Sequence, residues 1–248
     1  MTSNLLLASL SPEILDHIQP HLRAVELSFG ASIAEMGEPV ELVYFPHEGM
    51  ISFVVELLDG ARIETAMVGR EGVVNASGAL SGGLSMGIAA VQLAGHASAI
   101  EAGRFAQLAD KLPPLLSAVN LHTQVFLAQT QQTSACHAVH SAEARICRWL
   151  LQLRDNAQSN RFMLTQEFLA QMMGVQRASV SIVATGLKSK GLIHYTRGNI
   201  MIIDVDGLRR HACECYDAVK AHQAHLYGAG AGHGRPTASS GHHLSELG

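Results

Sequence analysis

The chain has 248 residues, of which 48% are hydrophobic and 15% are charged, as in an ordinary soluble protein that can bury two modest cores. No signal peptide and no apolar run of transmembrane length occurs in the sequence, which excludes a membrane-spanning chain and favours a cytoplasmic protein with no membrane partner. The formal net charge of −4 argues weakly against a protein that binds nucleic acid.

The distribution of charge reverses that last argument. Residues 1–140 contain 5 Lys and Arg against 13 Asp and Glu, a net charge of −8. Residues 141–210 contain 10 Lys and Arg against 5 Asp and Glu, a net charge of +5. The charge is segregated as if only the second part of the chain faced phosphate.

The first part of the chain predicts a β-roll. Leu10, Ile14 and Ile18 have the spacing of a short N-terminal helix that packs down on a core. From Leu22 to Ile100 the apolar residues alternate, and turn sequences separate the runs, which is typical of antiparallel strands. The clearest hairpin signal is Asp59-Gly60. We assign residues 1–112 to this domain.

A segment of small residues, Asn75 to Gly87, interrupts the predicted strands. Its glycine-rich part, Ser77 to Gly83, matches neither a P-loop nor a dinucleotide-binding fingerprint. Backbone amides alone could still cradle a phosphate there, but a mobile or ligand-adaptive loop is the favoured interpretation.

A long helix is predicted from Pro113-Pro114 to His140, and a heptad-like series of residues runs along it. Such a helix is not stable alone, so we expect a second copy of the chain to cover the seam in a homodimer. The residues expected at this dimer interface are Leu115, Val119, His122, Phe126 and Thr133.

Two groups of residues suggest a metal site only faintly. Cys136 and His140 stand one turn apart on the long helix, and Cys213 and Cys215 form a second group beside His211. The four cysteines of the chain include no CxxC pair of the zinc type, and two ligands on one helix do not complete a coordination shell. We therefore interpret these residues as interface or hinge residues and predict no metal, no cofactor and no catalytic residue.

A helix is predicted from Ser141 to Asp155, with the only tryptophan, Trp149, in the core of the following domain. The same spacing places Arg145, Arg148 and Arg154 on the outer side of this helix. A polar connector, residues 156–160, leads to the next motif.

The stretch from Leu164 to Gly198 predicts a winged helix-turn-helix. Thr165 is placed as an N-cap, Gly174 breaks the first helix, and a recognition helix follows over about residues 176–190. The N-terminal turn of such a helix meets base edges, and Arg177 is its best donor for guanine. The residues expected to contact DNA are Thr165, Gln176, Arg177, Ser179, Lys188 and Arg197.

Two strands around the turn Thr196 to Asn199 form the wing, and a final helix is predicted over about residues 206–225. The DNA-binding domain therefore spans residues 141–227. Residues 228–248 contain almost no apolar side chains and are expected to form a disordered tail.

Leu164-Thr165, Ala170, Gly174, Arg177, Val180 and Gly191-Leu192-Ile193 together resemble the cyclic-AMP receptor protein and FNR (Crp-Fnr) family of bacterial transcription regulators. The resemblance implies an α+β fold with an N-terminal jelly roll of the cyclic-nucleotide-binding type, a dimerisation helix over residues 113–140, and a C-terminal winged helix-turn-helix. It also implies double-stranded DNA as partner, a small-molecule effector, and RNA polymerase as a further partner.

The same resemblance places an effector pocket at Arg70, Glu71, Ser85, Met86, Thr130 and Gln131. Members that bind a cyclic nucleotide hold its phosphate with an arginine and a small hydroxyl residue, and here that pair is replaced by Ser85-Met86. No arginine occurs between Arg70 and Arg104, so only Arg70 could substitute from the neighbouring turn. A buried phosphate without a cation is costly, and cyclic AMP is therefore not predicted as the effector.

The sequence therefore predicts a homodimeric, sequence-specific DNA-binding transcription regulator that is not an enzyme. One alternative is a signalling or partner-binding module whose helix-turn-helix no longer binds DNA. A second is a metal-dependent β-roll enzyme, although after His21 the roll contains only His47 and His96 and no HxH pair. The cluster of cysteines near the N-terminus that oxygen-sensing relatives use for an iron-sulfur cluster is absent.

Overall fold

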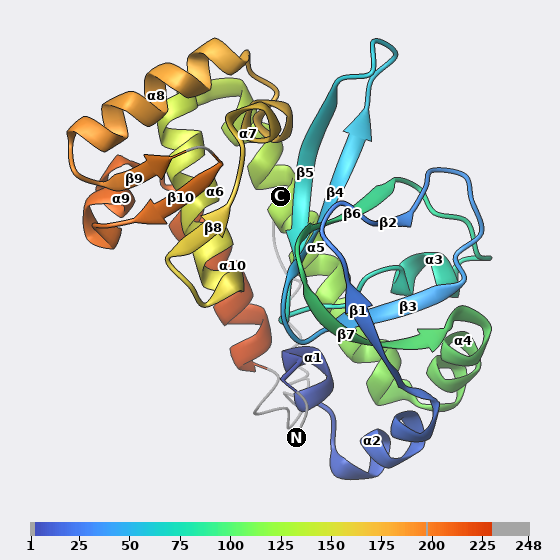
Figure 1. The fold of residues 1–248 in the computed structure, drawn as a ribbon. Coiled ribbons are helices and arrows are strands. Elements are labelled where there is room, and N and C mark those ends of the chain that lie inside the picture. The colour runs from blue at the N-terminus through green and yellow to red at the C-terminus, as the bar shows by residue number, and fades with distance from the viewer. Residues whose placement is uncertain (1–2, 197, 230–248) are drawn as a thin grey trace, which may run out of the picture.

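The computed structural model of the protein describes residues 3–196 and 198–229. It has two lobes, a β-roll and a smaller lobe of helices with a three-stranded sheet, and helix α5 (Pro113–Val139) runs from the first toward the second (Figure 1). Within the described residues, none of the helices combines the length and the apolar character needed to cross a membrane.

The N-terminal segment forms α1 (Leu5–Ala8), α2 (Pro12–Ile18) and the 3₁₀ helix η1 (Gln19–His21). Two helices replace the one that was predicted, because Ser11 accepts a hydrogen bond from the Ile14 amide and Pro12 begins a new helix. The predicted inward packing is confirmed, since Leu10, Ile14 and Ile18 are buried.

The roll consists of two antiparallel sheets, as predicted. One has the order β1 (Arg23–Leu27), β7 (Gly95–Glu101), β3 (Leu42–Pro46). The other has the order β2 (Ser32–Ala34), β6 (Ile88–Leu93), β4 (Met50–Glu56), β5 (Arg62–Val68). The predicted hairpin at Asp59-Gly60 joins β4 to β5, and Gly60 has the positive φ of +81° that the turn requires. The small-residue segment contains a short helix, α3 (Ala76–Leu80), and α4 (Ala102–Lys111) follows the roll.

The expected dimer seam on α5 is wrong, because that face is buried in its own chain. Leu115 and Val119 belong to the core of the roll, and His122 and Thr133 are also buried. Phe126 is half-buried and packs edge-on against Phe53 with ring centroids 4.7 Å apart. The heptad pattern was therefore real, but elements of the same chain cover it, the roll over its first part and α10 farther along.

The second lobe contains α6 (Ala142–Ala157), β8 (Arg161–Met163), α7 (Gln166–Met173) and α8 (Arg177–Ser189), then β9 (Ile193–Thr196), β10 (Asn199–Ile202), α9 (Val205–His211) and α10 (Cys215–Ala229). Strand β8 was not predicted; it pairs with β10 and extends the two-stranded wing to the order β8-β10-β9.

The predicted final helix is broken in two, because Ala212 has an extended backbone with a ψ of 155° between α9 and α10. The predicted tail over residues 228–248 lies outside the described residues from residue 230 onward.

Two arginines of α6 that were expected on the surface are buried. Arg145 is 8% exposed and Arg148 is 2% exposed. The guanidinium of Arg145 donates to the Met173 carbonyl oxygen at the end of α7, and that of Arg148 donates to Gln152 Oε1 at 3.2 Å. Helix α6 is buried on more than its apolar face, because α7, α8, α9 and α10 of its own lobe and strand β4 of the roll all contact it.

Trp149 joins the two lobes rather than filling only the core of the second lobe. Its indole Nε1 donates to Glu64 Oε1 on β5 at 2.8 Å, and Ser52 on β4 donates to the other carboxylate oxygen. The surrounding apolar cluster contains Met50 and Met67 of the roll together with residues of α6, α7 and α8. A buried polar group at this junction requires these partners, so the contact fixes how the lobes meet.

Burial raises the pKa of Glu64 from 4.5 to about 7, although the hydrogen bonds from Ser52 and Trp149 and the nearby charge of Arg148 oppose the shift. The folded chain therefore retains a proton on this carboxyl that the unfolded chain releases. The stability that this retained proton provides is complete below pH 4.5 and is lost as the pH rises through 7.

We predict that Glu64→Gln removes this loss of stability. We compare pH 5 with pH 8, between which the folded chain releases this proton. Over this range the wild type should lose on the order of 3 kcal/mol more of its free energy of unfolding than the variant loses. Denaturant titrations of both proteins at the two pH values measure this difference. The histidines titrate alike in both proteins, so their contribution cancels. Glu56→Gln, at an exposed glutamate paired with Arg62, is the control and should behave as the wild type. Parallel curves for the wild type and Glu64→Gln would contradict the raised pKa.

Candidate nucleic-acid interface and effector cavity

Helices α7 and α8 form the helix-turn-helix, and local chemistry fixes both ends of α7. Thr165 Oγ1 accepts from the Phe168 amide at 3.1 Å, which caps the first turn. At the other end Gly174 has a φ of +59°, and a Cβ there would also lie 3.2 Å from the Ile63 side chain of β5. The glycine is therefore required both by the turn and by the close approach of the roll.

Helix α8 buries one face and exposes the other at the outer edge of its lobe (Figure 1). Val180, Ala184 and Leu187 are buried against the lobe. The opposite face carries exposed or half-exposed side chains at helical spacing, namely Arg177, Ala178, Ser181, Ile182, Thr185 and Lys188. A helix exposed at the edge of its domain in this way is free to enter a DNA groove.

The predicted DNA contacts occupy different positions around this face. Gln176 is the N-cap of α8 and makes no capping hydrogen bond with its side chain, and Arg177 is the first helical residue. Lys188 is exposed near the C-terminal end of α8, whereas Ser179 is only half-exposed. Thr165 lies at the start of α7, and Arg197 lies outside the described residues.

Sequence reasoning missed two residues of this surface, Ser181 and Thr185. Thr185 is exposed, and its hydroxyl donates to the Ser181 carbonyl oxygen at 2.8 Å. The signal that could have found them is the helical period, because both lie opposite the apolar series of α8.

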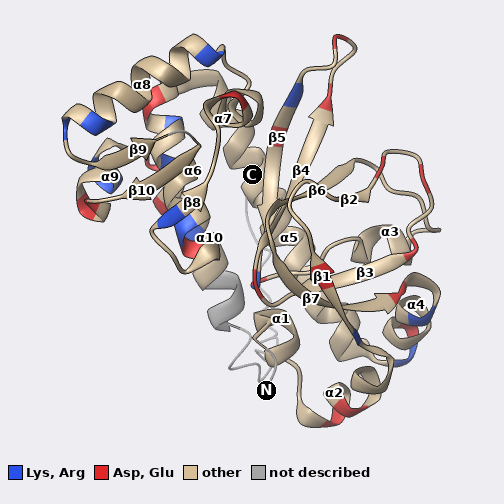
Figure 2. Cartoon of the chain, in the orientation of Figure 1, with Lys and Arg blue, Asp and Glu red and all other residues tan. Residues whose placement is uncertain are grey.

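Charge supports the same surface. Lys and Arg residues lie on α6, α8, α9 and the adjoining sheet, whereas Asp and Glu are more frequent on the roll (Figure 2). Arg177 is the most accessible of them for a base, since its side chain is 69% exposed and, among the described residues, it forms one loose ion pair, with Nε 3.7 Å from Glu167 Oε2. An exposed pair of this kind contributes between 0 and about 1 kcal/mol, so Arg177 can leave it at little cost.

A cavity of about 340 Å³ lies between the roll and α5. Its walls are mostly apolar and include Phe53, Val54 and Phe126. Its polar groups are mainly hydroxyls, from Thr65, Ser77, Ser81, Ser85, Thr123 and Thr130. Among the described residues, no Lys or Arg lines it.

His122 is the titratable group in the cavity wall, and burial lowers its pKa to about 4. The Val73 amide donates to its Nε2 at 3.4 Å. The imidazole is therefore neutral near pH 7 and supplies no positive charge to a ligand.

The structure does not bring all six expected effector residues together. Ser85, Met86 and Thr130 line the cavity. Arg70 and Glu71 instead line a second hollow, of about 250 Å³, between the roll, α6 and α10, and the Glu71 carboxylate accepts from the Gly69 amide of its own turn. Gln131 points outward on α5. The turn that carries Arg70 faces the second lobe, which is why it supplies no cation to the cavity.

The histidines of the roll do not form a metal centre. His47 and His96 stack on each other with ring centroids 5.5 Å apart, and His47 Nε2 bonds to Ser98 at 2.8 Å. Over residues 3–196 and 198–229, the single group of ligand atoms close enough for an ion is Cys136, His140, Cys213 and Cys215, far from these two histidines in the chain.

Residues 144–211 match the Crp-like helix-turn-helix domain family. The match covers the stretch from α6 through the wing to α9, which includes every element of the DNA-binding surface described above. No curated protein matches the chain at the sequence level.

Several solved structures share the fold of this chain. FixK2 from Bradyrhizobium japonicum has a TM-score of 0.66 at 17% identity, over 77% of this chain and 98% of its own. The c-di-GMP responsive global regulator CLP from Xanthomonas campestris has a TM-score of 0.65 at 17% identity, over 78% and 100% of the two chains. TTHB099, a transcriptional regulator of the CRP family from Thermus thermophilus, has a TM-score of 0.64 at 24% identity, over 76% and 96%. At these identities the similarity establishes the fold.

Proposed function

We propose that this chain, which has the CRP/FNR fold and a Crp-like helix-turn-helix domain over residues 144–211, is a homodimeric transcription regulator that binds double-stranded DNA sequence-specifically. The observation that carries the proposal is the outward face of α8, where the exposed Arg177 begins the helix. The functional division is a sensor over residues 1–112, a dimerisation helix over 113–140 and a DNA-binding domain over 141–227. The chain has no catalytic role in this proposal.

Arg177 donates to the O6 and N7 atoms of guanine, and Gln176 reaches a neighbouring base. Thr165, Ser179, Lys188 and Arg197 hold phosphates, and the half-exposed Ser181 and the exposed Thr185 extend the contact along α8. Ala178 and Ile182 present only apolar groups, which contact thymine methyl groups and make no hydrogen bond to a base edge.

Arg177→Ala should weaken binding to the preferred site by about 1 to 3 kcal/mol and change binding to random duplex little. The preferred site is first selected from a random duplex library, and affinities are then measured by fluorescence anisotropy over a range of salt concentrations. Arg23→Ala, at an exposed arginine of the roll, is the matched control and should bind as the wild type.

Equal losses on both duplexes would make Arg177 a phosphate contact only. A wild-type chain that binds no duplex, with no salt dependence, would contradict DNA binding altogether and favour a partner-binding module.

The dimer uses an exposed face of α5 that flanks the face buried in the chain. Leu116, Asn120, Thr123, Leu127, Thr130 and Ser134 lie on it at heptad spacing, and all but the half-exposed Thr130 are exposed. Leu127 is 56% exposed and is the largest apolar side chain near the middle of this seam. A partner that covers it places two recognition helices on one duplex, as dimeric helix-turn-helix proteins require.

Leu127→Arg should therefore give monomers with reduced affinity for the preferred site, because it places charges at the centre of the seam. Sedimentation velocity measures the assembly. Leu58→Arg, at a leucine exposed on the β4–β5 hairpin, is the matched control and should stay dimeric. A Leu127→Arg protein that remains a dimer would place the interface elsewhere.

The effector is an uncharged or weakly polar small molecule bound in the roll cavity. The cavity offers apolar walls, several hydroxyls and a neutral imidazole, which suit such a ligand and not a phosphate. Thr123 and Thr130 belong both to the cavity wall and to the exposed seam of α5. Ligand binding therefore acts directly on the surface that dimerises.

Cyclic AMP and cyclic GMP should not switch the protein. A ligand shifts an equilibrium only by its differential affinity for the two states, and the cyclic phosphate finds no cation in the cavity. Each nucleotide is titrated to millimolar concentration while affinity for the preferred site and melting temperature are followed, and neither should change. A saturable rise in either quantity would contradict the prediction, and its loss in Arg70→Ala would identify the cation.

A further inference from the structure

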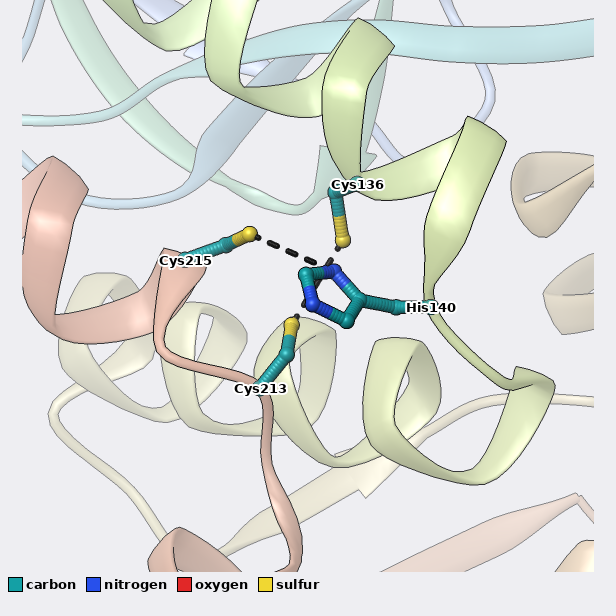
Figure 3. Close-up of side chains that lie close together, drawn as sticks. All are labelled: Cys136, His140, Cys213 and Cys215. Carbon is teal, nitrogen blue, oxygen red and sulfur yellow. Dashed lines mark hydrogen bonds between the residues drawn. The ribbon is translucent and has the colours of Figure 1, made fainter.

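Two pairs of residues that are 73 or more positions apart in the sequence meet in one cluster. Cys136 lies in the last turn of α5 and His140 directly follows that helix, while Cys213 and Cys215 flank the junction of α9 and α10. One ligand atom from each of the four residues lies within 4.8 Å of all the others. Figure 3 shows the imidazole between the three sulfur atoms.

We propose that Cys136, Cys213, Cys215 and His140 bind a single Zn²⁺ ion. The Sγ atoms of Cys136 and Cys213 are 3.5 Å apart, and Cys215 Sγ is 3.5 Å from His140 Nδ1. A tetrahedral zinc site with Zn–S bonds of about 2.3 Å places its sulfur atoms about 3.8 Å apart, so small shifts complete the geometry. Three thiolates and one imidazole form a closed ligand set of the structural zinc type, with no open position for catalysis.

The surroundings orient the ligands as a metal site requires. The Nε2 atom of His140 lies 3.2 Å from Glu214 Oε1, while Nδ1 is the ring nitrogen 3.5 Å from Cys215 Sγ. A carboxylate in this position fixes the tautomer that leaves Nδ1 free for the metal. Gln132 Nε2 donates to Cys215 Sγ at 3.0 Å, which suits a thiolate acceptor.

Charge and burial agree with the proposal. Cys136 and Cys215 are fully buried and Cys213 is 8% exposed. The guanidinium groups of Arg145 and Arg148 act electrostatically on Cys136, and within the described part of the chain neither forms an ion pair with a carboxylate or has a hydrogen-bond partner for its Nε. Zn²⁺ with three thiolates carries a net charge of −1, which compensates these buried cations.

A disulfide explains less of this arrangement. The Sγ atoms of Cys136 and Cys213 are 3.5 Å apart, whereas a disulfide bond is about 2.0 Å long. A disulfide would also not explain why His140 Nδ1 is directed toward Cys215, or why the Glu214 carboxylate lies against the other nitrogen of the ring.

The ion would connect the DNA-binding lobe to the dimerisation helix. His140 lies in the short junction between α5 and α6, and Cys213 and Cys215 follow the last element matched by the helix-turn-helix family. Bound metal therefore fixes the orientation of α8 relative to α5. This role, unlike the binding of metal itself, rests on the proposed function in DNA binding.

The test begins with the untagged full-length chain purified under reducing conditions. Mass spectrometry of its metal content should find about one zinc per chain. The chain stripped of metal and titrated with Co²⁺ should show the thiolate-to-cobalt charge-transfer bands and the strong visible bands of a tetrahedral ion. Binding to histidines elsewhere in the chain produces no thiolate charge transfer.

Cys136→Ser and Cys213→Ser should lose the zinc and the cobalt spectrum. Cys147→Ser is the matched control, because Cys147 is the fourth buried cysteine and lies outside the cluster, and it should retain both. If the serine variants do not fold, the cobalt titration of the wild type still decides the matter.

Absence of thiolate-bound cobalt in the reduced wild type would overturn the site, as would an equal loss in Cys147→Ser or an iron-sulfur chromophore. A Cys136–Cys213 disulfide in a chain that binds no metal when reduced would assign the cluster to redox chemistry instead. Removal of zinc should weaken binding to the preferred duplex on the order of tenfold or more. Unchanged DNA binding after removal would overturn the positioning role, and a wild type that binds zinc but no duplex would refute the proposed function while the site stands.

Discussion

Helix α5 buries one face in the β-roll of its own chain, and the other features of the molecule depend on that contact. Leu115 and Val119 complete the core of the roll, and farther along His122 and Phe126 close the cavity. Because this face is occupied, the dimer that we propose uses a neighbouring exposed face of α5, which carries Leu127. The same helix ends at the cysteine and histidine cluster, so the cavity, the proposed dimer face and the second lobe all contact one helix.

Two of the contacts that connect the second lobe to the rest of the chain involve buried polar or sulfur groups. One is the junction of Trp149 with Glu64, where a buried carboxyl is hydrogen-bonded inside an apolar cluster. The other is the cluster of Cys136, Cys213 and Cys215 with His140 at the end of α5. Neither is on the recognition surface, yet each constrains where α8 lies. A regulator built in this way could respond at the cavity, at the junction or at the cluster, since each biases the same orientation.

Both the cavity and helix α8 present mainly uncharged or apolar groups. The cavity has hydroxyls and a neutral His122 where a cyclic nucleotide needs a cation. On α8, Ala178 and Ile182 present apolar groups beside the single guanidinium of Arg177. A shared fold does not fix the ligand or the DNA sequence, because these depend on the cavity lining and on the exposed side chains.

The sequence by itself determined the features that depend on local chemistry. Thr165 and Gly174 delimit α7 through a cap and a positive φ, and the apolar period of α8 reveals its outward face, since neighbours along the chain decide both. Only the tertiary structure decided what covers the heptad of α5, why Arg145 is buried, and that two separate ligand pairs meet. A helical period predicts that one face of a helix is buried, but it does not predict which element covers that face. Residues that lie 73 or more positions apart come together in one cluster only through the packing of the whole chain.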